Sequence, residues 1–269
     1  MNLKTQIKQE IEKLLKQSDL LKYDSIIETL ETPPNPEMGG IATNISFSVA
    51  KKLGKSPVKI SEEIVIDGNV IEEVWKKGEE GQFVNQNGSI PELKTTFKWL
   101  WDDNYLYGAF HVEDDDIWST KTTYDDSLWL EEVVEFFIDA DCCPKTYAEF
   151  EINPLNTILD LFLLNKYNNR KDIYQLWKWD CKGLKSAVKV VGTVDNRNDA
   201  DQYWDFEVAI PLNMIYTSPN VPPIVGDKWK IDFCRGENRK DGKFVATSWS
   251  PPAFHNPLSY GTIIFEGSK

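Results

Sequence analysis

With 269 residues, 41% of them hydrophobic, the chain is long enough for one large domain with an extension or for two domains. Its formal net charge of −13 is uneven, because residues 1–64 hold nine Lys and nine Asp or Glu and all of the excess negative charge lies in the remainder. An acidic surface repels phosphate backbones and anionic lipid head groups, so this second part is not expected to bind nucleic acid or membranes.

The first segment is predicted to be helical. Apolar residues recur at helical spacing over residues 3–17, and a second helix is predicted over residues 41–53, ended by Gly54. A short third helix should start at residues 56–57, and Pro and Gly make residues 31–40 a loop. The amphipathic N-terminus lacks the apolar core of a signal peptide, and no later segment has the roughly 18 consecutive apolar residues of a spanning helix. We therefore expect a soluble, cytoplasmic protein without membrane association.

From about residue 65 the hydrophobic pattern changes to a period of two, which is typical of strands. Aromatic residues alternate over residues 97–101 and again over residues 105–109, and the turn-forming sequence of residues 102–104 between them predicts a hairpin. Further strands are predicted at residues 133–138, 147–152, 158–164, 187–194, 203–210, 229–234 and 262–265.

Many short strands with turn-rich connections favour two packed sheets. The predicted fold class is therefore mainly β. We expect a two-sheet antiparallel β-sandwich over residues 65–269, preceded by an α-helical N-terminal extension over residues 1–64.

Two stretches contain the residues that best suit a binding site. Trp129 precedes a strand that is apolar on both faces except for Glu135, and a buried-looking strand has no reason to carry a charge unless something polar meets it. Near the C-terminus, Phe254 and His255 lie in a Pro-rich loop between two strands. A sugar presents apolar C–H faces and a rim of hydroxyls, so an aromatic, a carboxylate and a histidine together suit a glycan. For Trp129 and Glu135, a purely structural role stays open.

Other reactive residue types are expected to be structural. Cys142 and Cys143 are adjacent and Cys181 and Cys234 are isolated, so no C-x-x-C spacing exists and reduced thiols are expected. His111 lies within a strand and is expected to be a hydrogen-bonded face or core histidine rather than a base. Most tryptophans of a sandwich must be buried. We expect this of Trp75, Trp99, Trp101, Trp204, Trp229 and Trp249.

Six motifs in order make the second part resemble the family 9 carbohydrate-binding modules. They read IVIDGNVIEEVW, FKWLWDDNYLYGAFHVEDDDIW, LWLEEVVEFFIDAD, YAEFEINPLNTILDL, WDFEVAIPLNMI and SWSPPAFHNPLSYGTIIF. Each is an ordinary strand or turn sequence alone, but six in family order over about 200 residues are specific for the fold. The resemblance implies a β-sandwich and non-catalytic carbohydrate binding.

The resemblance also implies a site. In members of the family with known ligands, two aromatics sandwich a terminal sugar while a carboxylate and a basic side chain bind its hydroxyls. By motif, Trp129 takes the first aromatic position, Glu135 the carboxylate position and Phe254 the second aromatic position, which is usually Trp. Glu151 stands where an arginine occurs in the sugar-binding members. With His255, these residues are the predicted ligand-binding set.

The first part has a resemblance of its own. PPNPEMGGIATNISFSVAKKLGKSPVKISEEIV is similar to the N-terminal, tRNA-contacting domain of arginyl-tRNA synthetases, over about residues 1–65. The synthetase catalytic signatures are absent, so aminoacylation is not expected. The alternative function is thus a tRNA-associated scaffold that uses residues 1–64, although a segment without net charge attracts RNA weakly and a packing role is favoured.

Two further possibilities concern the acidic residues. Glu135 and Glu151 on neighbouring strands would suit a glycoside hydrolase, which uses paired carboxylates, but nothing in the sequence indicates a raised pKa, so an enzyme is not predicted. Asp114, Asp115 and Asp116 form an acidic loop that could hold a structural calcium ion, as related modules do. A solvated loop is the alternative, and no other cofactor is expected.

Overall fold

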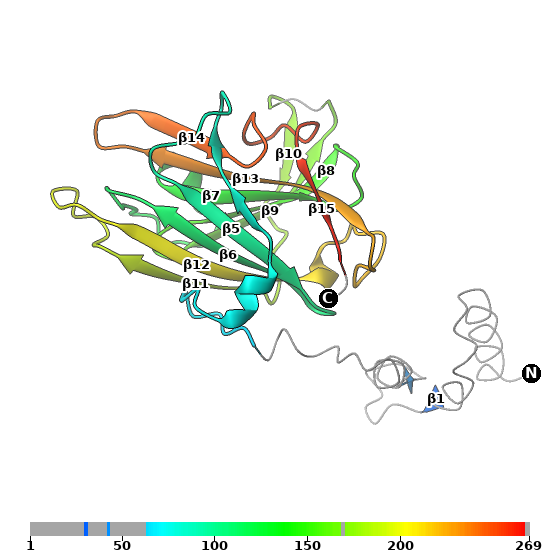
Figure 1. Ribbon diagram of the computed structural model, residues 1–269. Helices are drawn as coiled ribbons and strands as arrows, with labels where there is room; N and C mark the ends of the chain where they lie inside the picture. The colour runs from blue at the N-terminus through cyan, green and yellow to red at the C-terminus, as the bar shows by residue number, and fades with distance from the viewer. Residues whose placement is uncertain (1–29, 32–41, 44–62, 168–169, 267–269) are drawn as a thin grey trace, which may run out of the picture. The chain divides into compact units, whose positions relative to one another are not determined.

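The computed structural model describes residues 30–31, 42–43, 63–167 and 170–266 (Figure 1). The chain divides into two compact units, residues 1–59 and 60–269. None of the described helices is long and apolar enough to cross a membrane.

In the first unit, two short strands are described. β1 (Leu30–Glu31) pairs with β2 (Ala42–Thr43) in antiparallel register. The helix predicted over residues 41–53 is therefore wrong at Ala42 and Thr43. The pairing with β1 holds these two residues in an extended conformation, and the helical spacing of apolar residues does not encode such a partner. The rest of that helix, and those predicted over residues 3–17 and from residues 56–57, lie outside the described residues.

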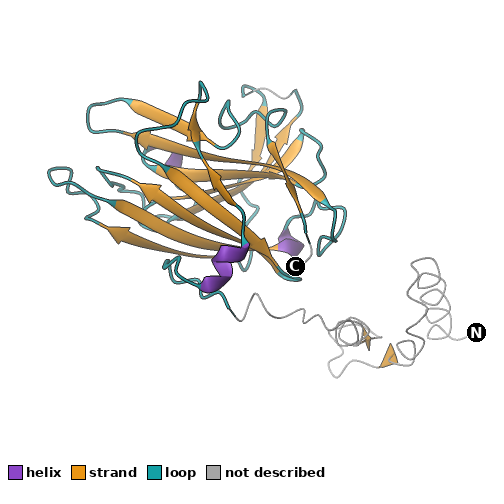
Figure 2. Cartoon of the chain, in the orientation of Figure 1, coloured by secondary structure: helices purple, strands orange, loops and turns teal. Residues whose placement is uncertain are grey.

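The second unit is a sandwich of two antiparallel sheets, as predicted (Figure 2). The eight-stranded sheet contains, in spatial order, β10 (Ile173–Leu176), β9 (Ile158–Asn165), β8 (Thr146–Ile152), β7 (Val133–Asp139), β13 (Lys228–Asn238), β14 (Phe244–Ser248) and β4 (Val84–Asn85), with β15 (Gly261–Ile264) also paired to β13. The five-stranded sheet contains β11 (Lys185–Val191), β12 (Tyr203–Pro211), β6 (Tyr105–Glu113), β5 (Thr95–Trp101) and β3 (Glu80–Gln82). Short 3₁₀ helices are η3 (Glu73–Lys77), η4 (Leu128–Leu130) and η5 (Leu212–Met214).

The nine predicted strands are all present in the second unit, and four others among its described residues were missed. The missed strands β3, β4, β10 and β14 are short and at most partly apolar, so their period-two signal is weak. The strand predicted over residues 187–194 ends earlier, at Val191. The next residue, Gly192, leaves the strand conformation with a φ of +150°. A Cβ at this position would meet the Asp201 side chain at 2.2 Å, so the position requires glycine.

The hydrophobic core fills the space between the two sheets. Phe110 and Phe206 of the five-stranded sheet stack with ring centroids 4.4 Å apart, and Phe136 and Phe233 approach them from the eight-stranded sheet. The tryptophans expected in the interior are confirmed there. Trp75, Trp204 and Trp229 are buried, and Trp99, Trp101 and Trp249 are partly buried against the core.

The eight-stranded sheet also buries its other face. Along β7, Val134, Phe136 and Ile138 face the core between the sheets, so Val133, Glu135 and Phe137 point away from it. This second surface, which we call the outer face, is covered by the chain between β14 and β15. That segment, residues 249–260, is here called the closing loop. Figure 1 shows it, in orange to red, beside β8 and β10.

The closing loop exists because β13 is longer than its neighbours on that edge. The C-terminal half of β13 pairs with β14 and its N-terminal half pairs with β15, both on the same side. The chain must leave the sheet between the two partners, and there it packs Ala253, Phe254 and Tyr260 onto the outer face.

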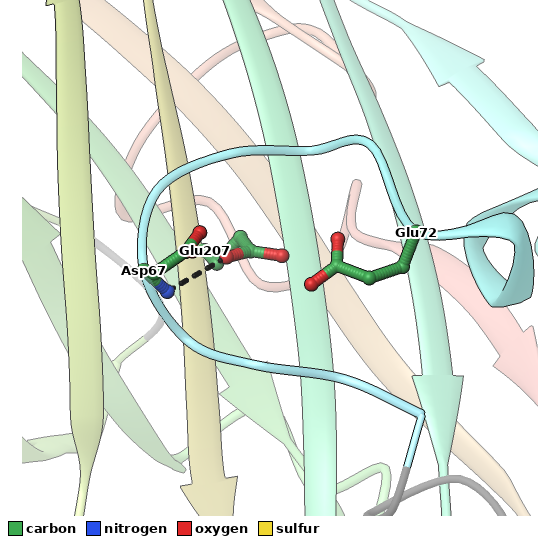
Figure 3. Close-up of side chains that lie close together, drawn as sticks. All are labelled: Asp67, Glu72 and Glu207. Atoms are coloured by element: carbon green, nitrogen blue, oxygen red, sulfur yellow. Dashed lines mark hydrogen bonds between the residues drawn. The ribbon is translucent and has the colours of Figure 1, made fainter.

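A buried carboxylate on the five-stranded sheet forms hydrogen bonds with the segment that precedes the first strand of the sandwich. Glu207 of β12 accepts hydrogen bonds from the backbone N–H groups of Asp67 and Gly68 and from the indole N–H of Trp75. Figure 3 shows Glu72 and Asp67 on either side of it. Burial raises the pKa of Glu207 to about 7, and these donors oppose the rise. The carboxylate thus orders the loop that leads into η3.

Candidate functional site

The outer face brings together all five residues predicted for ligand binding. Glu135 lies on β7 and Glu151 on β8, directly opposite each other in the strand register. Trp129 lies in η4, just before β7, while Phe254 and His255 lie in the closing loop. The two strands, the short helix and the loop therefore converge on one surface.

A third glutamate completes the carboxylates of this face. Glu149 precedes Glu151 by two residues on β8, so both side chains point to the outer face. One carboxylate oxygen from each of Glu135, Glu149 and Glu151 lies within 4.8 Å of the others. We call these three residues the glutamate triad. Sequence reasoning missed Glu149, although the alternation in Glu-Phe-Glu could have revealed it.

The glutamate triad is buried, and this sets its protonation. Burial raises the pKa of Glu135 to about 8, and the charge of Arg170 opposes the rise. Burial and then the neighbouring carboxylates also raise the pKa of Glu149 and that of Glu151, to which the backbone N–H of Trp129 donates an opposing hydrogen bond. The three groups together favour a bound proton or another positive charge.

His255 lies beside the triad in its neutral form. Its Nε2 is 3.7 Å from a carboxylate oxygen of Glu149, and its Nδ1 is 3.1 Å from the hydroxyl of Tyr147. Burial, helped by the charge of Arg170, lowers the pKa of His255 to about 4. The imidazole therefore adds a polar contact but no positive charge near pH 7.

Phe254 is held more tightly than an open stacking platform would be. It is 9% exposed, and its ring packs against Phe244 with a centroid distance of 6.4 Å. Its φ of +70° is uncommon for a residue with a large side chain. A hydrogen bond from its backbone N–H to Cys234 Sγ, 3.1 Å away, holds the turn on β13.

Two tryptophans that lie close together provide exposed aromatic surface. Trp129 is 38% exposed and Trp177, which follows β10, is 42% exposed. Their ring centroids are 6.4 Å apart with an interplanar angle of 51°. Trp177 was not predicted from sequence, because nothing in its local pattern separates it from the buried tryptophans.

A basic side chain also reaches this face from an unpredicted position. The guanidinium of Arg170, in the connection between β9 and β10, lies 5.3 Å from the ring centroid of Phe254. Its positive charge lowers the pKa values of Glu135, Glu149 and His255. Glu151 thus occupies the position that the resemblance gives to arginine, while an arginine approaches from a different loop.

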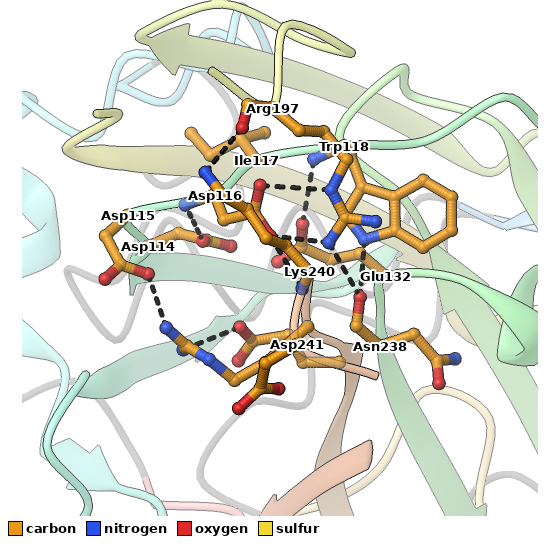
Figure 4. Close-up of polar contacts among 12 residues, drawn as sticks. Asp114, Asp115, Asp116, Ile117, Trp118, Glu132, Arg197, Asn238, Lys240 and Asp241 are labelled. Atoms are coloured by element: carbon orange, nitrogen blue, oxygen red, sulfur yellow. Dashed lines mark hydrogen bonds and ion pairs between the residues drawn. The ribbon is translucent and has the colours of Figure 1, made fainter. Parts of the chain in front are cut away.

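The acidic loop considered for calcium is a network of ion pairs (Figure 4). Asp114 pairs with the buried Arg235 at 2.7 Å, and Asp116 accepts two hydrogen bonds from Arg197. Asp115 pairs with Arg239 at 2.8 Å. The carboxylate oxygens that would ligate calcium already face guanidinium groups, which is a poor fit for the ion. The calcium prediction itself stays a prediction.

Of the other reactive residues, His111 is hydrogen-bonded, as expected. The Nδ1 of His111 lies 2.6 Å from a carboxylate oxygen of Asp205 on the neighbouring strand, so it is a hydrogen-bonded face histidine. All four cysteines are free, two exposed and two buried.

Two family models match the chain. The model described as Carbohydrate family 9 binding domain-like matches residues 66–268, and the model described as Arginyl tRNA synthetase N terminal domain matches residues 1–85. Both resemblances read from the sequence are thereby confirmed, and the second extends about 20 residues beyond the expected boundary, into the sandwich.

Similar proteins follow the same division. An arginine–tRNA ligase of Methanosphaera stadtmanae is 52% identical over 62 residues, which are 23% of this chain and 11% of the ligase, so the chain spans only about a tenth of that relative. A protein of Arthroderma benhamiae named "Extracellular protein" is 25% identical over 199 residues, covering 68% of this chain and 85% of that protein.

A solved structure shares the sandwich fold. It is a family 9 carbohydrate-binding module from Caldicellulosiruptor kristjanssonii in complex with cellotriose, with a TM-score of 0.53, 20% identity, and coverage of 77% of this chain and 91% of the module. The module from the same organism has also been solved in complex with glucose.

Proposed function

The chain belongs, through residues 66–268, to the Carbohydrate family 9 binding domain-like family, and on this basis we propose that its sandwich binds a sugar without catalysing a reaction. The family is one of binding domains, and the synthetase-like part corresponds to an N-terminal domain alone. The observation that carries the proposal is the convergence of all five predicted ligand residues on the outer face.

The chemistry of this face suits a sugar. An exposed indole, Trp129, offers an apolar surface for the C–H face of a ring, and Trp177 lies beside it. Glu135, Glu151 and His255 offer polar atoms for hydroxyl groups. Phe254 contributes indirectly to the site, because its backbone hydrogen bond to Cys234 Sγ fixes the turn of the closing loop over β13. Cellotriose and glucose, the ligands of the solved module, are the first sugars to test.

Tryptophan fluorescence titration of the full chain with glucose, cellotriose and a panel of other sugars tests the proposal. Burying an aromatic face contributes about 1.5–3 kcal/mol, which corresponds to roughly 10- to 100-fold in affinity. Trp129→Ala should lower affinity by that factor without unfolding the protein, and Trp177→Ala should weaken binding if the second indole also stacks.

The matched control is Tyr216→Ala, which removes an exposed aromatic outside this cluster and should leave the affinity unchanged. Unchanged sugar affinity in Trp129→Ala would reject this site. No saturable response to any sugar would reject the proposed function.

A second candidate rests on the 52% identity of the N-terminal segment to an arginine–tRNA ligase. In this alternative the segment contacts tRNA and the sandwich mediates assembly. Filter binding of tRNA at low salt, with the full chain and with a chain lacking residues 1–62, tests it. Retention that is lost on truncation and on raising the salt would support the alternative, and absence of retention would exclude it. The cytoplasmic location stays a prediction.

A further inference from the structure

The glutamate triad is a concentration of buried negative charge that the proposed sugar contacts do not explain. Glu135, Glu149 and Glu151 are each 2–3% exposed, and their nearest oxygens all lie within 4.8 Å of one another. Like charges so close together in an environment of low polarity repel strongly. Such a group persists only if something compensates the charge.

The acidic loop shows how this chain compensates a similar group elsewhere. There, Asp114, Asp115 and Glu237 also form a cluster of three carboxylates, but Arg235 and Arg239 form ion pairs with them at 2.7–3.2 Å. Each carboxylate of that cluster faces a guanidinium. The two arginines thus compensate most of this charge from within the protein.

The triad has no comparable compensation within the described part of the chain. Nε2 of His255 lies 3.7 Å from the nearer carboxylate oxygen of Glu149, which is longer than a hydrogen bond. Arg170 is exposed and stacks on Phe254, from where its single charge acts on the triad only at longer range.

Two oxygens of the triad are also left without hydrogen bonds. Oε2 of Glu149 and Oε2 of Glu151 are buried and find no hydrogen-bond partner among the described residues. Buried carboxylate oxygens are rarely unpartnered in folded proteins. Both belong to the same cluster, so they indicate a ligand common to the three side chains.

The donor set defines the chemistry of that ligand. Three carboxylates and no thiolate are the ligands of a hard divalent cation such as Ca²⁺ or Mn²⁺, whereas Zn²⁺ favours sulfur and nitrogen. We infer that Glu135, Glu149 and Glu151 form a binding site for a hard divalent cation beneath the closing loop. The inference stands whether or not the outer face binds a sugar.

Calorimetric titration of the full chain, first freed of metal with a chelator, tests the inference in the absence of sugar. CaCl₂ and MnCl₂ are the two probes. At least one should bind saturably at a single site, with a Kd on the order of 10⁻⁶ to 10⁻³ M, the span of many protein calcium sites. The same ion should raise the midpoint of thermal unfolding, because it binds the folded state only.

Variants locate the site. Glu149→Gln and Glu151→Gln keep the side-chain shape, remove a charged ligand and should each weaken binding at least tenfold. Circular dichroism should show both folded, because an uncharged amide relieves repulsion. The control is Asp115→Asn, which removes a carboxylate from the acidic loop and should leave the affinity unchanged.

Three results would overturn the inference. One is the absence of binding heat and of any thermal shift with both ions. Another is binding that survives in both triad variants but is lost in Asp115→Asn, which would place the cation in the acidic loop. The third is binding with unchanged affinity in both triad variants and in Asp115→Asn, which would place the cation outside both clusters. A parallel sugar titration in chelator tests the proposed function separately.

Discussion

At the scale of single residues, a buried arginine, Arg235, forms ion pairs with several buried carboxylates. Arg235 is 4% exposed and lies within 2.7–3.2 Å of the carboxylates of Asp114, Glu132 and Glu237. The charges of these carboxylates raise its pKa against the opposing effect of burial. One guanidinium thus serves as the shared counter-charge for carboxylates just after β6, just before β7 and on β13.

Removing this arginine should be costly. Arg235→Met would leave three buried carboxylates without their shared counter-charge, so we expect a loss of about 3–5 kcal/mol in the free energy of unfolding. Urea denaturation measures it. The control Lys243→Met breaks an exposed pair with Asp241 and should change stability by less than about 0.5 kcal/mol. Equal effects of the two substitutions would contradict the role given to Arg235.

The pKa values of the two histidines are shifted in opposite directions from the usual value. The hydrogen bond that the Asp205 carboxylate accepts from His111 raises the pKa of His111 above its usual 6.5, whereas burial lowers that of His255 to about 4. His111 therefore adds stability that is complete below pH 6.5 and is lost as the pH rises through its folded pKa. His255 lowers stability as the pH falls from 6.5 towards 4.

NMR titration of the two imidazole rings measures both values, and because the chain has only two histidines the assignment needs only one variant. Asp205→Asn should return His111 to about 6.5, the unperturbed value, and leave His255 unchanged. Identical titration of both rings near that value would refute the two environments.

At the scale of elements, the path of the closing loop determines which side chains cover the outer face. The backbone N–H of Trp249 bonds to the carbonyl of Phe233 in β13, and the Ser250 N–H bonds to the Asp232 carboxylate, so the loop leaves the sheet in a fixed direction. It returns at Gly261, where a Cβ would lie 2.3 Å from the Trp249 ring. The departure and the return of the loop therefore pack against each other.

Gly261→Ala should disturb this packing. The added methyl group overlaps the indole, so we expect a loss of about 1–3 kcal/mol in the free energy of unfolding. Gly236→Ala is the control, because a Cβ there meets its nearest atoms, in the Phe244 ring, at 3.3 Å and needs only a small adjustment. Thermal or urea unfolding compares the two. A Gly261→Ala variant as stable as the control would show that Trp249 moves aside freely.

At the scale of the whole molecule, the chain joins a sandwich to a segment of different ancestry. The sandwich lies in a compact unit of residues 60–269 and has its own core between two sheets. The synthetase-like match continues to residue 85, past η3 and into β4, so the boundary by similarity and the boundary by compactness differ.

Because its core lies within one unit, the sandwich should fold without the first unit. A chain starting at residue 60 is expected to unfold in one cooperative transition, with a thermal midpoint within a few degrees of the full chain. Calorimetry checks this. A loss of cooperative unfolding on truncation would show that the first unit completes the sandwich fold.

The sequence by itself determined the sandwich and much of the candidate site. Alternating apolar residues predicted the strands, since burial on one face of a pleated strand imposes a period of two. Glu135 was identified because it is an isolated acid in an otherwise apolar strand, where a charge needs a polar partner. Family motifs indicated Trp129 and Phe254. Only the tertiary structure decided which groups meet Glu135. Strand register places Glu151 opposite it and Glu149 close by, and loops bring Arg170 and Trp177 from distant parts of the chain. Such proximity depends on pairing and loop path, which local sequence does not encode.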